Sequence, residues 1–246
     1  MADREAVLSA IRDERLKSQS TLRRLMAMPE LGAIAGAVLV FLFFSIAARG
    51  TGMFAADGVL NWVTVAGQLT IIATGAALLM IGGEFDLSVG SMIGFAGMMI
   101  AIPTVYFGVP IELSVIFAFL GALVIGFLNG LIVVRTRLPS FIVTLASLYI
   151  LRGMTIALSI LFANRTIVSG VRNFAEGTFV QALFAGKAFP GLFVWLTEAG
   201  IIAALPNGDP AVKGIPAVVL WAVVIAVIAH IVLSRTRLGN WIFASG

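Results

Sequence analysis

Apolar runs of membrane length recur along this chain of 246 residues. At about 1.5 Å of rise per residue, a helix of roughly twenty apolar residues crosses about 30 Å of hydrocarbon. The chain is 60% hydrophobic and only 11% charged, whereas a soluble domain has about 45–50% apolar and about 25% charged residues. A soluble fold of this length could not bury so much apolar surface, so much of the chain must lie in lipid.

Polar and proline-containing breaks between these runs predict an all-α fold, a polytopic transmembrane helix bundle with about six spans. The predicted spans are residues 31–48, 62–81, 89–107, 111–134, 141–162 and 215–233. We therefore divide the chain into a transmembrane domain, residues 31–246, and an N-terminal leader, residues 1–30. The leader has mixed charges and apolar residues at helical spacing, which fit either a helix lying on the cytoplasmic leaflet or a solvated segment.

Residues 163–214 differ from the predicted spans in their mixed polarity. They contain a weaker apolar run, residues 189–205, which Pro190, Gly191 and Glu198 interrupt. This run could be a seventh span. We instead expect a short helix or re-entrant segment in an outer, periplasmic region.

The distribution of basic residues predicts the orientation, because Lys and Arg are enriched in cytoplasmic segments. With the N-terminus in the cytoplasm, six spans place ten of the sixteen Lys and Arg residues inside and five outside. Arg152 is the sixteenth and lies within a span. A spanning run at 189–205 would move Arg235 and Arg237 outside, which is the reason for preferring six spans.

The break between the second and third spans carries two acids among three glycines, in the sequence GGEFDLSVG at residues 82–90. Glycine permits backbone turns that other residues resist, and an ionisable group close to hydrocarbon is costly unless it is paired or wetted. Glu84 and Asp86 could therefore face a translocation path or pair with a partner protein. They could also hold an inner gate closed against a basic group such as Arg135 or Arg137. The alternative is a solvated cytoplasmic turn.

Three further polar residues lie within predicted spans. Arg152 is near mid-membrane, where its guanidinium needs an acid, carbonyl groups or water. It could form a structural pair, for which Glu84 or Asp86 is a possible partner. Alternatively, it could contact a substrate. Gln68 and Asn129 could form hydrogen bonds between helices or line a path. The Gly-x-x-x-Gly pairs Gly90/Gly94 and Gly126/Gly130 would allow close helix approach.

The residue inventory argues against several kinds of chemistry. The chain has no cysteine and one histidine, which excludes thiolate and multi-histidine metal sites. No catalytic motif is present, so we expect no enzyme, cofactor or metal. The phosphate-binding pattern Gly-x-x-x-x-Gly-Lys-Ser/Thr is also absent, so ATP-driven movement of a solute would need another chain. The net charge of +4 reflects orientation and does not indicate nucleic-acid binding.

Three stretches together resemble the permease subunits of bacterial ribose/xylose-type ABC importers. These are GGEFDLSVGS at 82–91, LPSFIVTL at 138–145 followed by LRG at 151–153, and RTRLGNWIFASG at 235–246. The resemblance extends over residues 31–246. One departure is the pair Glu84-Phe85 before Asp86, where many members have a single apolar residue.

The resemblance implies a permease in the bacterial inner membrane that imports a monosaccharide, such as a pentose. It also implies cytoplasmic ATP-binding subunits, a periplasmic sugar-binding protein and a second permease copy, in a homodimer. Members of the family continue beyond this point with an ATPase-docking segment and further spans, so we expect the chain to be C-terminally truncated. The alternative function is an ion-coupled secondary transporter that uses Glu84, Asp86 and Arg152.

Overall fold

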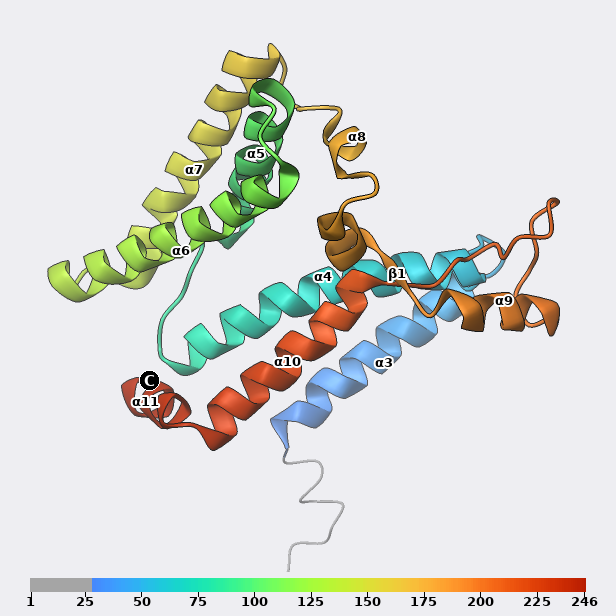
Figure 1. Cartoon of the computed structure of the whole chain (residues 1–246). Helices are drawn as coiled ribbons and strands as arrows, with labels where there is room; N and C mark the ends of the chain where they lie inside the picture. The colour runs from blue at the N-terminus through green and yellow to red at the C-terminus, as the bar shows by residue number, and fades with distance from the viewer. Residues whose placement is uncertain (1–27) are drawn as a thin grey trace, which may run out of the picture. The chain divides into compact units, whose positions relative to one another are not determined.

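The computed structural model describes residues 28–246, most of which are helical (Figure 1). The chain divides into two compact units, Met1–Ala55 and Ala56–Gly246. Residues 1–27, which make up most of the predicted leader, lie outside the described residues. In the first unit, helix α3 (Pro29–Ala47) begins with a proline, whose missing N–H costs nothing at a helix start.

Five helices of the second unit are long and apolar enough to cross a membrane. They are α4 (Ala56–Ile81), α5 (Val89–Phe107), α6 (Ile111–Thr136), α7 (Ser140–Ala163) and α10 (Ala217–Arg235). They overlap the second to sixth predicted spans, although α4 begins six residues earlier than the predicted span 62–81. The first predicted span falls in α3, where the apolar run Leu31–Ala47 is shorter. The predicted all-α, polytopic fold class is therefore confirmed.

The turns between α5, α6 and α7 follow from local residues. Helix α5 ends where Gly108 adopts a left-handed conformation, with φ of 63°, and α6 ends at Arg137 with φ of 58°. Pro110 and Pro139 then stand immediately before α6 and α7, where a fixed φ suits the start of a helix. These short connections bring the three helices together as neighbours.

The helices of the second unit pack in two sets. Helix α5 contacts both α6 and α7, whereas α4 runs along α10 (Figure 1). Small residues allow close approach: a Cβ on Gly67 of α4 would meet the Cα of Val219 of α10 at 3.3 Å. Between α5 and α6, the fully buried Thr104 donates a hydrogen bond to Ser114 at 2.9 Å, as is usual for polar contacts between membrane helices.

Short elements occupy the predicted periplasmic segment between α7 and α10. In chain order they are α8 (Val171–Ala175), the π-helix η1 (Gln181–Ala185), β1 (Lys187–Ala188), α9 (Pro190–Glu198) and β2 (Ile215–Pro216). Strands β1 and β2 pair in antiparallel register, with Lys187 opposite Pro216. Helix α9 has nine residues, about 14 Å at 1.5 Å each, and is too short to cross a bilayer.

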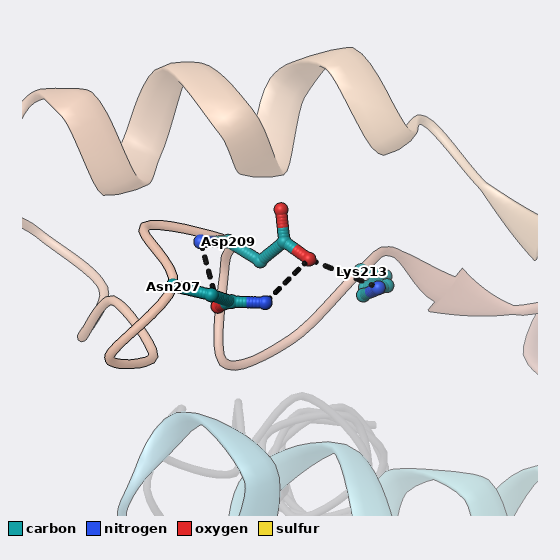
Figure 2. Close-up of polar contacts among 3 residues, drawn as sticks. All are labelled: Asn207, Asp209 and Lys213. Carbon is teal, nitrogen blue, oxygen red and sulfur yellow. Dashed lines mark hydrogen bonds and ion pairs between the residues drawn. The ribbon is translucent and has the colours of Figure 1, made fainter.

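A polar turn precedes β2 (Figure 2). The Asp209 carboxylate accepts hydrogen bonds from Asn207 at 3.2 Å and from the Lys213 ammonium at 3.5 Å. The Asp209 N–H donates back to the Asn207 side chain at 3.2 Å. Both members of the ion pair are largely exposed, so the pair contributes at most about 1 kcal/mol.

Candidate functional site

The glycine-containing break between α4 and α5 is a tight turn. Helix α4 ends at Ile81, and Gly83 adopts φ of 80°, a conformation that glycine reaches without strain. The N–H of Glu84 still donates to the Leu79 carbonyl at 3.1 Å. The predicted helix break is therefore present, and it turns the acids Glu84 and Asp86 away from the axis of α4.

The first turn of α7 holds this break in place. The N–H of Phe85 donates to the Ser140 hydroxyl at 3.0 Å, and the N–H of Leu87 donates to the Thr144 hydroxyl at 3.1 Å. The Thr144 hydroxyl in turn donates to the Ser140 carbonyl at 2.8 Å. Both hydroxyl side chains are buried. These hydroxyls therefore replace the carbonyl partners that a continuous helix would supply to the two N–H groups.

A chain of hydrogen bonds leads from α7 through α6 to Asp86. The Ser147 hydroxyl donates to the Asn129 side-chain oxygen, and the Asn129 amide donates to the Ser88 hydroxyl at 3.4 Å. The Ser88 hydroxyl and backbone N–H both donate to one Asp86 oxygen, at 2.6 and 2.7 Å. Every donor points toward the carboxylate. Aligned hydrogen bonds of this kind polarise one another, and this chain fixes the position of the Asp86 side chain.

A cavity of about 200 Å³ lies beside this chain of hydrogen bonds. The break contributes Glu84, Phe85 and Asp86, α6 contributes Asn129 with its flanking residues, and α7 contributes Ser140 and Thr144. Among residues 28–246, the Glu84 side chain has no hydrogen bond or ion pair. The cavity therefore offers one unengaged carboxylate together with a fixed set of hydroxyl and amide groups.

Three of the five predicted site residues, Glu84, Asp86 and Asn129, meet at this cavity. Gln68 does not, because it lies exposed on α4 beside the buried Gly67. Arg152 does not either: it is exposed and lines a separate groove of about 420 Å³ between α5 and α7. The ion pair of Arg152 with Glu84 or Asp86, which the sequence left possible, is absent, and Arg152 has no ion pair within the described part of the chain.

The gate pair with Arg135 or Arg137 is also not formed in this structure, where both arginines are exposed at the end of α6. The close helix approach that was predicted at four glycines is found at only one of them. A Cβ on Gly94 would meet Thr155 of α7 at 3.5 Å, whereas Gly90, Gly126 and Gly130 have no such neighbour. Instead, Gly126 and Gly130 leave room for the cavity that they line.

Sequence analysis missed the three hydroxyl residues that complete the site, Ser88, Ser140 and Thr144. Ser140 and Thr144 follow Pro139 at a spacing of one helical turn, which places them on one face at the start of α7. That spacing was a usable signal. The spacing did not reveal that these hydroxyls bind the backbone of the break, because the break lies more than fifty residues earlier in the chain.

The end of α11 (Arg237–Ser245) lies against the glycines of the break. The Thr236 side chain accepts from the Gly239 N–H at 3.3 Å and so starts this helix. At its end, a Cβ on Gly83 would meet the Gly246 Cα at 3.3 Å. Two elements distant in sequence, α7 and α11, thus both contact the break.

Comparison with known proteins gave one family-model match, which covers residues 58–246 and is described as branched-chain amino acid transport system / permease component. The xylose transport system permease protein XylH of Haemophilus influenzae is 28% identical over 85% of this chain and 63% of its own length. XylH of Escherichia coli is 37% identical over 55% of this chain and 33% of its own length.

A third relative, the ribose import permease protein RbsC of Haemophilus influenzae, is 26% identical over 85% of this chain and 55% of its own length. The chain therefore spans less than two thirds of the length of each of these relatives. No solved structure matches the chain significantly.

Proposed function

We propose that this chain, which belongs to the family described as branched-chain amino acid transport system / permease component, is a permease subunit of an ATP-binding-cassette importer in the bacterial inner membrane. The observation that carries the proposal is the family match over residues 58–246, a region that contains four helices of membrane-spanning length and all but the first two residues of a fifth, α4. The family resemblance of the motifs at the break and at the start of α7 supports it.

The proposed cargo is a monosaccharide of the pentose type. The support comes from the names of the relatives, which specify xylose and ribose, and from the chemistry of the cavity. A sugar is neutral and presents hydroxyl groups, for which carboxylate, amide and hydroxyl side chains are suitable partners. A zwitterionic amino acid would need a cation and an anion close together, but Arg152 lies in a different groove from Glu84 and Asp86.

The proposed assembly contains two copies of the permease, cytoplasmic ATP-binding subunits and a periplasmic sugar-binding protein. ATP hydrolysis belongs to the separate subunits, because these 246 residues contain no phosphate-binding Gly-x-x-x-x-Gly-Lys-Ser/Thr pattern.

The N-terminus is proposed to be cytoplasmic. Because the chain has no cysteine, single Asn207→Cys and Asn240→Cys variants would report sidedness cleanly: only position 207 should react with an impermeant thiol reagent added outside.

Within this assembly, the break at 82–90 is proposed to act at the cytoplasmic gate, with Asp86 holding it closed. The support is that Asp86 terminates the hydrogen-bond chain from α6 and α7. Asp86→Asn keeps the size of the side chain but weakens the bonds it accepts from Ser88. We expect basal ATPase activity of the importer to rise or uptake to fall, while the affinity of the binding protein for sugar stays unchanged. If ATPase activity, uptake and sugar affinity all stay at wild-type values, the break is a surface turn without a gating role.

The alternative, an ion-coupled secondary transporter, needs Glu84, Asp86 and Arg152 in one relay. Their separation into two cavities with no shared lining residue argues against it. Uptake of labelled xylose by cells expressing the transport system separates the two functions. An ATP-driven importer should keep its activity with an uncoupler present and lose it when ATP is depleted. Collapse of uptake with the uncoupler, at maintained ATP, would support the alternative instead.

A further inference from the structure

We propose that the end of the second unit opposite the break holds a phospholipid, with a zwitterionic headgroup between α4 and β1 and an acyl chain along α10. This site is independent of the transported cargo and of the orientation of the chain. Two neighbouring hollows, one polar and one apolar, carry the proposal.

The polar hollow has a volume of about 190 Å³ and lies at the start of α4. Asp57, Asn61 and Thr64, from the first turns of α4, line it together with Lys187 of β1. It therefore presents one carboxylate, one ammonium, one amide and one hydroxyl. The Thr64 hydroxyl donates its proton to the Leu60 carbonyl, which leaves its oxygen free to accept.

The apolar hollow is a groove of about 590 Å³. Residues Leu220, Trp221 and Val224 form its α10 side, and η1 contributes Ala182 and Leu183. On the α10 side of the groove, the indole N–H of Trp221 is already bonded to the Leu183 carbonyl at 2.9 Å. Apart from Lys187, the groove thus offers an apolar surface whose indole donor is satisfied, which suits a hydrocarbon chain.

Lys187 lines both hollows. Neither Lys187 nor Asp57 takes part in an ion pair among residues 28–246, although both line the polar hollow. Lys213 provides the contrast, since its ammonium is engaged by Asp209 (Figure 2). An unengaged cation and an unengaged anion complement a headgroup that carries a phosphate and an ammonium, with the phosphate on Lys187 and the ammonium on Asp57.

The position of the two hollows matches the layers of a bilayer. Asp57 lies in the first turn of α4, and Lys187 is opposite Pro216, which directly precedes α10. Both charges therefore lie where the spanning helices begin, at the level expected for headgroups. The groove then follows α10 from Ala217 to Val224, about 10 Å along the axis, into the region of the acyl chains.

The test is lipid binding by the purified chain in detergent, measured by native mass spectrometry with phosphatidylethanolamine. We expect Lys187→Gln to lower the affinity by about tenfold, the equivalent of one charge-assisted hydrogen bond. Lys213→Gln is the matched control and should bind as wild type does, because that ammonium already has a partner. Circular dichroism would verify that both variants fold.

Two further binding measurements test the roles of the acyl chains and of the headgroup ammonium. Glycerophosphoethanolamine, which has the headgroup without acyl chains, should not displace the lipid, and phosphatidylglycerol, which lacks the ammonium, should bind more weakly than phosphatidylethanolamine. Equal affinity of wild type and Lys187→Gln for phosphatidylethanolamine would overturn the site. Displacement by the free headgroup would overturn the role of the groove, and equal binding of the two lipids would overturn the role of Asp57.

Discussion

The two polar regions that contact α7 differ in how their strongest groups are satisfied. At the break, Asp86 receives two donors from Ser88, and the donors behind it are paired in turn. Twelve residues beyond the start of α7, Arg152 lines a groove with Gly90, Gly94 and Thr155 but has no ion pair within residues 28–246. The Asp86 carboxylate is thus satisfied within the second unit, whereas the Arg152 guanidinium is not.

This difference bears on what each region can do in a membrane. A carboxylate that is hydrogen-bonded by its own chain can stay at its position without any partner protein. A guanidinium near the middle of a span must instead find an acid, carbonyl groups or water. We therefore expect the break to form on folding, and Arg152 to depend on a group from outside the described residues, such as a second copy of the chain.

The largest effect is expected at Arg152. In the proposed importer, Arg152→Ala should leave the partner group unpaired and weaken assembly by about 3–5 kcal/mol, the usual cost of breaking a buried pair. Size-exclusion chromatography and thermal unfolding of the purified assembly would measure the effect. Arg152→Lys should retain part of the interaction, because the charge remains while the planar, forked geometry is lost.

Arg172→Ala is the matched control for that variant. The Arg172 side chain is 86% exposed and pairs with Glu176, which directly follows α8, at 3.6 Å, so its loss should leave assembly unchanged. An Arg152→Ala protein as stable and as fully assembled as wild type would mean that the guanidinium extends to an interface. The contrast between the two regions would then disappear.

A smaller effect is expected at Asn129, which joins α6 to the break and to α7. Asn129→Leu leaves Ser88 and Ser147 without their amide partner in a buried place. A buried polar group without its partner costs about 1–3 kcal/mol. Thermal unfolding of Asn129→Leu, Ser147→Ala and the double variant would give the coupling energy. Strictly additive effects would show that the chain of hydrogen bonds is not cooperative.

The sequence allowed prediction of most helices but only part of the site. Spans follow from apolar length and proline or glycine breaks, which are local, and five of the six predicted spans correspond to helices of membrane-spanning length. Glu84, Asp86 and Asn129 were found because a polar group among apolar residues is conspicuous. Ser140 and Thr144 were missed because hydroxyls are common in membrane helices. Arg152 was grouped with the acids because its position along the predicted span does not reveal which face of α7 it occupies.

The smallest effect is expected at Thr144, which tests whether the break is held from α7. Thr144→Val keeps the shape of the side chain and removes the oxygen that accepts from the Leu87 N–H. The expected loss of stability is about 1 kcal/mol, the net value of one hydrogen bond. Amide exchange should respond more clearly than stability, because the Leu87 N–H loses its acceptor while the rest of the fold is kept.

Thr155→Val in the same helix is the control, because the Thr155 hydroxyl bonds only to the Leu151 carbonyl one turn earlier. Hydrogen–deuterium exchange of the peptide covering residues 82–90 should accelerate in Thr144→Val and stay unchanged in Thr155→Val. If exchange is equally fast in wild type and both variants, the break is already open in solution. Asp86 would then lack the fixed surroundings that a gate requires. If exchange is instead equally slow in all three proteins, another contact holds the break, for which the approach of Gly83 to Gly246 after α11 is the candidate.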